Sequence, residues 1–289
     1  MRHPDPNFGY PSLSFLEREQ MLGGLKQLQA KKKIIRSGAY VLDTFIDATS
    51  WDEAVNRIAD WGSEHQSRYV TLCNVHSVVT GSQNAKFATV INEADMALPD
   101  GAPIAWSMRK EGFAQQERIN GPDLMVRCLA EAEHRGQSVF FYGSADNTLT
   151  QLSARLLVKF PKLKIAGTAS PPFRKLTEKE DADYAQKIND SGAHVVFVGL
   201  GCPKQEVWMA KQRGAIKAVM VGVGAAFDYH AGTLRRAPLW MQQRGMEWLY
   251  RFVCEPRRLA RRYLETNSVF VVKVAVRSIF RKDPKHQKN

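Results

Sequence analysis

The chain has 289 residues, of which 44% are hydrophobic and 24% are charged, and its formal net charge is +12. This length and composition are ordinary for a globular protein with a full core, and they exclude a fibrous or low-complexity chain. The charge is concentrated at the end, since residues 251–289 hold eleven Lys or Arg and three Asp or Glu, a net of +8. Such a cationic segment favours an anionic partner: lipid headgroups, nucleic acid or a phosphorylated substrate.

The cysteines and the hydropathy pattern indicate the cellular compartment in which we expect the protein. No CxxC pair or zinc-binding spacing is present among Cys73, Cys128, Cys202 and Cys254, so we expect reduced, cytosolic thiols. No apolar signal-peptide core follows the first residues. The apolar stretch 269–279 is too short to span a bilayer and contains Lys273 and Arg277. We therefore expect a cytoplasmic protein that contacts a membrane peripherally.

The chain in order predicts three segments. Residues 1–38 form a basic N-terminal extension that we expect to be partly disordered. In residues 39–234 strands alternate with helices. Strands are predicted at 69–73, 96–98, 138–142, 163–166, 194–200 and 217–223, and helices at about 50–65, 77–92, 103–110, 122–135, 147–159, 177–189 and 203–213. This βαβ spacing predicts a Rossmann-like α/β core with a mostly parallel sheet flanked by helices.

The third segment, residues 235–289, is predicted to be a basic, helical C-terminal appendage. Trp240, Trp248 and Tyr250 lie among arginines there. Aromatic and basic residues together suit a membrane interface. The alternative, aromatics that simply pack on the core, explains the excess of arginine poorly.

The stretch 195–206 combines a buried strand, a glycine turn and a helix start. Residues 195–198 are apolar, and Gly199 and Gly201 end the run. Pro203 suits the first turn of a helix, where its missing N–H needs no partner. Backbone N–H groups and the positive end of the helix dipole then meet in one space that attracts a phosphate. The polar residues that follow favour this interpretation over an ordinary βα turn: Lys204, Gln205 and Glu206.

Two further strand ends carry glycine. The strand at 138–142 runs into Gly143, and the strand at 217–223 is followed by Gly224, Phe227 and Asp228, with Gly222 inside it. Ligands of open α/β sheets bind outside the carboxyl ends of the strands. We therefore expect these residues and the 199–206 turn to line one crevice.

Asp100 is the main candidate for catalysis. It follows a short apolar strand in a Pro-Asp-Gly turn, where partial burial would raise the pKa of the carboxyl and suit a general base. Asp-Gly is also a favoured turn pair, so the turn alone has a structural explanation. Thr71 and Asn74, at another strand end, could bind a sugar or a base, and Arg118 could bind phosphate.

Together these motifs resemble the WecG/TagA/CpsF glycosyltransferases, which are family 26 of the sugar transferases. The resemblance runs in unbroken order from about Tyr40 to Tyr263. Two departures stand out: Leu72 occupies the place where the family often has threonine, with Thr71 one residue earlier, and residues 1–38 have no counterpart. The landmarks are Asn74, Leu98-Pro99-Asp100-Gly101, Arg118 with Gly121-x-Asp123-Leu124, Gly199-x-Gly201-x-Pro203-Lys204-Gln205-Glu206, Gly222-Val223-Gly224, Phe227-Asp228, Gly232, Arg236-Ala237-Pro238, Glu247-Trp248-Leu249-Tyr250-Arg251 and Pro256-x-Arg258.

The resemblance implies an inverting transfer of a sugar from a UDP-sugar to a polyprenyl-diphosphate-linked sugar, without a metal or other cofactor, in bacterial surface polysaccharide synthesis. It implies that Asp100 is the general base, that Asn74 orients a sugar and that Arg118 holds the diphosphate. Gln205 and the glycine turns would line the nucleotide pocket. The C-terminal arginines that would reach the leaving group are Arg251, Arg258 and Arg261.

Several alternatives remain at this stage. Asp181 and Asp183 match the D-x-D pattern of metal-dependent sugar transferases, but they lie in a capped helix that we expect to be solvated. A nucleic-acid-binding protein would need a recognition module that the sequence lacks, so we expect no nucleic acid partner. A nicotinamide-dependent oxidoreductase would need a glycine fingerprint after the first strand. The donor sugar (N-acetylmannosamine, its uronic acid or glucose), the acceptor and homo-oligomer formation stay open.

Overall fold

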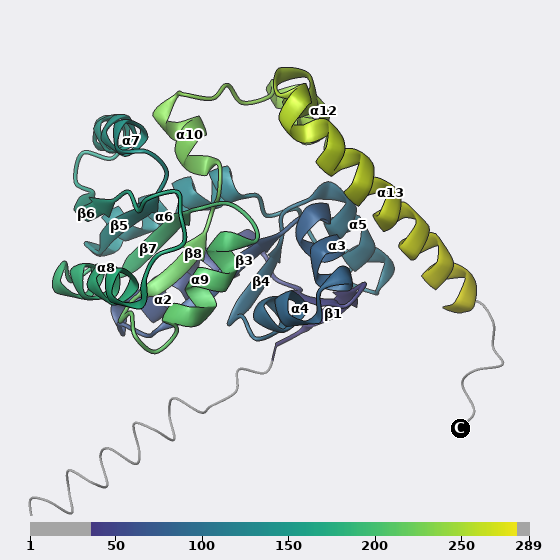
Figure 1. The fold of residues 1–289 in the computed structure, drawn as a ribbon, viewed down its shortest axis with the longest axis horizontal. Coiled ribbons are helices and arrows are strands. Elements are labelled where there is room, and N and C mark those ends of the chain that lie inside the picture. Colours follow the sequence, from purple (N-terminus) through teal and green to yellow (C-terminus); the bar gives the residue numbers. More distant parts are fainter. Residues whose placement is uncertain (1–35, 282–289) are drawn as a thin grey trace, which may run out of the picture. The chain divides into compact units, whose positions relative to one another are not determined.

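A computed structural model of the chain describes residues 36–281, together with their side chains except at Arg258, 261–262 and 278–281 (Figure 1). The predicted N-terminal extension therefore lies almost wholly outside the described residues. Within the described range, no helix is long and apolar enough to cross a membrane.

A six-stranded parallel sheet forms the centre of the fold, as the alternation of strands and helices predicted (Figure 1). Its order is β4-β3-β8-β7-β5-β6, and each pair of neighbours is parallel. The strands are β3 (Arg68–Cys73), β4 (Met96–Pro99), β5 (Ser138–Gly143), β6 (Lys164–Ala169), β7 (Val195–Gly199) and β8 (Val219–Gly222). A small antiparallel hairpin, β1 (Gly38–Val41) and β2 (Thr44–Asp47), precedes the sheet and was not predicted.

The core helices begin where capping residues predict. Ser50 with Glu53, and Thr177 with Glu180, form complete capping boxes. The single helix predicted at 77–92 is wrong, because the chain breaks at Asn84, whose side chain accepts the N–H of Phe87 and starts a new helix. The helices are α2 (Trp51–Ser63), α3 (Val75–Gln83), α4 (Ala85–Asn92), α5 (Ala102–Lys110), α6 (Gly121–Arg135), α7 (Asp146–Lys159), α8 (Glu178–Asp190), α9 (Lys204–Gln212) and α10 (Ala226–Ala231).

Helices α8 and α9 cover one face of the sheet, and their packing corrects one expectation. The rings of Tyr142, in β5, and Trp208, in α9, stack with centroids 4.1 Å apart. The indole N–H of Trp208 donates to Asp181 at 2.9 Å, and Lys211 pairs with the same carboxylate at 2.5 Å. Asp181 is therefore buried and paired instead of solvated, because α9 packs over it. Asp183 is exposed, as expected.

Residues 239–281 are mostly helical, as predicted, whereas the prediction that they form a separate appendage is not confirmed. These residues form α11 (Leu239–Gln243), α12 (Glu247–Cys254) and the long α13 (Pro256–Arg281). Helix α13 packs along α3, as Figure 1 shows, and Phe270 is buried there in a cluster with Val78 and Val79. Lys273 and Arg277 donate to backbone carbonyls of Ser82 and Leu42. These contacts attach α13 to the core. The predicted contact with a membrane stays a prediction.

The face of the sheet opposite α8 and α9 holds an aromatic group that reaches the carboxyl ends of the strands. Phe141 in β5 lies between Phe197 in β7 and Phe227 in α10, with ring centroids 6.0 Å and 5.7 Å away. All three side chains are fully buried. This group fixes α10 against the sheet.

We predict that Phe141→Ala lowers the free energy of unfolding by about 3–5 kcal/mol, because the change removes a buried ring from between two others. Denaturant unfolding followed by circular dichroism measures the loss. Val158→Ala is the control, since Val158 is 84% exposed and its removal is expected to change stability by less than about 0.5 kcal/mol. A loss below about 1 kcal/mol for Phe141→Ala would contradict this description of the core.

Candidate functional site

A cavity of about 1090 Å³ opens at the carboxyl edge of the sheet. Five strands contribute their last residue, or the residue just after it, to the cavity wall: Asn74 after β3, Asp100 after β4, Ser144 after β5, Gly199 in β7 and Gly222 in β8. The glycines that end β7 and β8 therefore line one crevice, as expected, whereas Gly143 at the end of β5 does not belong to its lining. A cavity of this size has room for a ligand larger than a typical drug-sized molecule.

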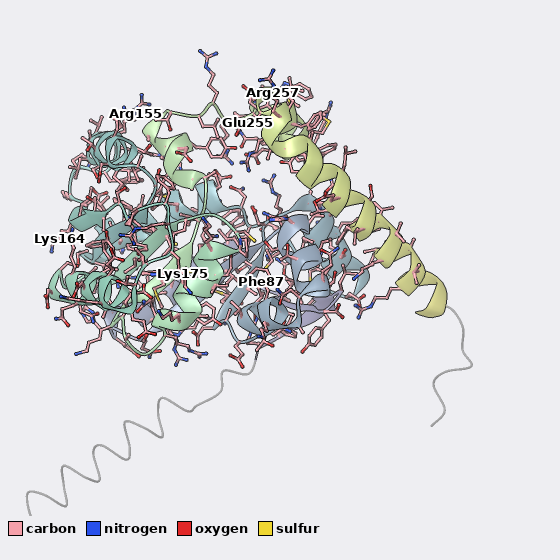
Figure 2. The ribbon with its side chains drawn as sticks, viewed as in Figure 1. Phe87, Arg155, Lys164, Lys175, Glu255 and Arg257 are labelled. Carbon is pink, nitrogen blue, oxygen red and sulfur yellow. The ribbon has the colours of Figure 1, made fainter. Side chains whose placement is uncertain are left out.

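The C-terminal helices close one side of this cavity. Trp248 and Arg251 in α12, and Tyr263, Asn267 and Phe270 in α13, belong to its lining. In Figure 2 the labelled Glu255 and Arg257 mark the junction between the two helices. The cavity therefore combines residues of the predicted core with residues of the predicted appendage.

Asp100 is held by hydrogen bonds from both neighbouring segments. Its N–H donates to the carbonyl of Cys73 at 3.0 Å, and its own carbonyl accepts Nε–H of Arg118 at 2.6 Å. The side-chain amide of Asn74 donates to Oδ2 of Asp100 at 3.4 Å. These bonds fix the main chain of Asp100 at the cavity wall, and Asn74 orients its carboxylate.

The surroundings of Asp100 raise the pKa of its carboxyl above the usual value for an aspartic acid. Burial is the largest cause, because a charge is poorly solvated there. The guanidinium of Arg118 lowers the pKa, the carboxylate of Glu247 raises it, and the Asn74 hydrogen bond and Arg251 lower it. A carboxyl with a raised pKa is a stronger base once it is ionised.

Asn74 has two structural partners. Its Oδ1 accepts the N–H of Ser77 at 3.2 Å, which caps the first turn of α3. The amide group that remains donates to Asp100. The capping bond therefore fixes the orientation of the amide toward Asp100, and the expected contact with a sugar stays a prediction.

A chain of ion pairs runs from Arg118 to the start of α6. Nη2 of Arg118 contacts Oε2 of Glu247 at 2.5 Å, and Oε1 of Glu247 lies 3.4 Å from Nε of Arg236. Arg236 in turn pairs with both oxygens of Asp123 at 2.6 and 2.8 Å. These bonds keep the pKa of Asp123 low despite its partial burial. Sequence reasoning gave no site role to Glu247 or Arg236.

The turn after β7 takes the geometry that its glycines suggested. A Cβ at Gly199 would lie 2.6 Å from the ring of Phe227, and Gly201 has a φ of +78°, which favours glycine. The N–H of Gly201 donates to Oε1 of Gln205 at 3.3 Å, and Nε2 of Gln205 donates to Glu206 at 2.9 Å. Gln205 is thereby fixed between the two glycine turns.

The remaining predicted residues differ in how they lie relative to the cavity. Those that line the cavity, besides residues already described, are Gly224 and Asp228. Thr71, Gly143, Glu206 and Phe227 are buried behind the wall, and Lys204 is exposed at the start of α9. Their contacts with a ligand stay predictions. Arg258 and Arg261 belong to α13, but their side chains lie outside the described part of the structure.

Tyr229 is a further lining residue that the sequence did not single out. Its ring lies 5.9 Å from the guanidinium of Arg251, and both residues line the cavity. Among the described residues, the hydroxyl of Tyr229 and Nε of Arg251 are buried and have no hydrogen-bond partner. Burial raises the pKa of Tyr229 to about 12, so its hydroxyl is a donor at neutral pH. Two hydrogen-bonding groups are therefore available beside the cavity.

No group of three or more His, Cys, Asp or Glu side chains gathers into a metal-binding arrangement within residues 36–281. Of the two aspartates in the D-x-D pattern, Asp181 has a carboxylate that accepts the indole N–H of Trp208 and pairs with the ammonium group of Lys211.

Comparison with known proteins identifies a protein family that this chain matches. Residues 39–284 match the family described as "Glycosyl transferase WecG/TagA/CpsF family". The chain is also similar to the N-acetylglucosaminyldiphosphoundecaprenol N-acetyl-beta-D-mannosaminyltransferase of Bacillus spizizenii, with 32% identity over 199 residues. That alignment covers 68% of this chain and 76% of the relative.

Proposed function

Because this chain belongs to the WecG/TagA/CpsF family of glycosyltransferases, we propose that it moves a sugar from a UDP-sugar to a polyprenyl-diphosphate-linked sugar. N-acetylmannosamine is the proposed donor sugar, because the relative from Bacillus spizizenii is named for it and for an undecaprenyl-diphosphate acceptor. The observation that carries this proposal is the half-buried carboxylate of Asp100, whose main chain is fixed at the wall of the large strand-end cavity.

In the proposed reaction, Asp100 removes the proton from the acceptor hydroxyl. The oxygen then forms a bond to the anomeric carbon of the donor, while the bond from that carbon to the phosphate breaks. UDP leaves with the electron pair, and the proton stays on the carboxyl of Asp100. Burial supports this role, because it raises the pKa of Asp100 and makes its ionised form a stronger base.

The leaving diphosphate carries negative charge that the protein must stabilise. Arg251 and Tyr229 offer buried donors beside the cavity, and the turns at Gly199–Gly201 and Gly222–Gly224 supply main-chain surface. Such fixed donors stabilise charge that develops in the transition state. We therefore propose transfer without a divalent ion, with Arg118, Arg251 and the glycine turns on the diphosphate side.

The exposed apolar residues of the C-terminal helices support a peripheral contact with the membrane that holds the acceptor. Leu239, Val253 and Leu264 are 69–73% exposed, within a segment of high positive charge. Apolar and cationic side chains together bind anionic lipid surfaces. In this proposal the enzyme works at the cytoplasmic face of the membrane.

The first test is release of UDP from UDP-N-acetylmannosamine, with and without polyprenyl-diphosphate-linked N-acetylglucosamine. We expect turnover only with the acceptor, and we expect it to persist in EDTA. UDP-glucose and the uronic acid of UDP-N-acetylmannosamine, assayed in parallel, identify the donor. Turnover that EDTA abolishes and magnesium restores would contradict the metal-independent mechanism.

Asp100→Asn is expected to lower kcat by about 10²- to 10⁴-fold, since the amide cannot accept the proton. Binding of UDP, measured by calorimetry, should change little, because the variant keeps the shape of the side chain. Asp190→Asn makes the same change at an exposed position at the end of α8, outside the cavity lining, and is the control that is expected to keep its turnover. Normal turnover by a folded Asp100→Asn variant would disprove the base assignment.

Val253→Glu together with Leu264→Glu is expected to reduce co-sedimentation with anionic phospholipid vesicles by about tenfold or more, because two apolar contacts become repelled charges. Leu157→Glu together with Val158→Glu introduces the same two charges at exposed positions of α7 and should leave vesicle binding unchanged. Equal binding by all variants would show that the C-terminal helices do not make the lipid contact.

A further inference from the structure

Glu247 is a buried acid for which the proposed reaction gives no role. It opens α12, its exposed fraction is 8%, and it lines the cavity. Burial of a carboxylate is costly unless it is paired. Each of its oxygens contacts a different guanidinium, that of Arg118 at 2.5 Å and that of Arg236 at 3.4 Å. The two arginines thus supply the pairing that this position requires.

One side of Glu247 is anchored to the core. Arg236 makes a two-point ion pair with Asp123, in the first turn of α6, and its Nη2 also lies 3.3 Å from Oδ1 of Asn120. Asn120 caps α6 by accepting the N–H of Asp123. Arg236 is therefore held in one place by several hydrogen bonds, and the Glu247 carboxylate is positioned against a fixed partner.

The other side of Glu247 reaches the Asp100 turn through one residue. Nε of Arg118 donates to the carbonyl of Asp100 at 2.6 Å, while Nη2 of Arg118 contacts Glu247. A single guanidinium thus connects α12 to the main chain of the proposed base. Without Glu247, the ion pair that holds the other end of the Arg118 guanidinium would be lost.

The charged and polar groups that act on Asp100 come from three parts of the fold. Asn74 comes from the end of β3, Arg118 from the loop before α6, and Glu247 and Arg251 from α12. Two positive charges and one amide donor favour the ionised form of Asp100 and would weaken it as a base. Glu247 is the one negative charge in this set, and it opposes them.

We infer that Glu247 is a positioning residue for the transfer: it holds Arg118 against the Asp100 turn and cancels part of the positive charge that Asp100 experiences. This inference rests on the proposed role of Asp100 as the base. Glu247 does not touch the reacting atoms. It keeps the carboxylate of Asp100 able to take the proton of the acceptor hydroxyl, while Arg118 stays in place.

The test compares the full-length protein with Glu247→Gln, using kcat and KM for the UDP-sugar across pH. For the wild type we expect kcat to fall on the acid side, as Asp100 becomes protonated. In Glu247→Gln the pKa of Asp100 should be lower, so this acid limb should move to lower pH. On the plateau kcat should fall by about tenfold with KM nearly unchanged, since the base is weaker and Arg118 is less fixed.

Two further variants separate charge from structure. Glu255→Gln removes the same charge from the other end of α12 and should leave the acid limb in place. Glu247→Asp keeps the charge on a shorter side chain, so its acid limb should lie between those of the wild type and Glu247→Gln. If Glu247→Gln fails to fold, as judged by thermal unfolding, Glu247→Asp provides the test.

An acid limb at the wild-type position in Glu247→Gln would overturn the inference, even if kcat falls, because a purely structural role predicts that pattern. A folded Glu247→Asp variant that keeps the wild-type kcat and shows its acid limb at the wild-type pH would overturn the inference as well. If the wild type shows no acid limb, or if Asp100→Asn retains it, the assignment of Asp100 fails and the inference fails with it.

Discussion

The hydrogen bond from Arg118 to the carbonyl of Asp100 is the contact on which the site depends. At 2.6 Å it fixes the turn after β4, and the same guanidinium reaches Glu247 in α12. A cation beside a catalytic carboxylate would ordinarily make it a weak base. The structure counters this with burial and with a second carboxylate, so that one arginine can fix the turn while the pKa of Asp100 stays raised.

The parallel sheet explains why these residues meet. Strand ends of a parallel sheet share one edge, and five of them supply cavity residues that are far apart in sequence. The aromatic group around Phe141 fixes α10, and with it Tyr229, at that edge. Helices α12 and α13 then add Glu247, Arg251 and Tyr263. The sheet therefore positions Asp100, the proposed base, and the C-terminal helices complete its electrostatic surroundings.

Local signals in the sequence predicted much of this fold. The capping boxes at Ser50 and Thr177, the alternation of strands and helices, and the glycine-ended strands are all short-range patterns. Contacts between distant residues were not accessible in this way. Asp181 is buried because Trp208 and Lys211 pack over it from α9, and Glu247 meets Arg118 across 129 residues of sequence. The missed residues share this feature: their roles arise only from tertiary packing.

The stereochemistry of the product tests the central claim most directly. A single displacement with Asp100 as the base inverts the anomeric centre, so an α-linked UDP-sugar should give a β-linked product. The one-bond carbon–hydrogen coupling at the new anomeric centre, measured by NMR on the purified lipid-linked product, distinguishes the two configurations. A β-linkage is the predicted result. An α-linkage would mean retention, which requires a different mechanism and would contradict the role assigned to Asp100.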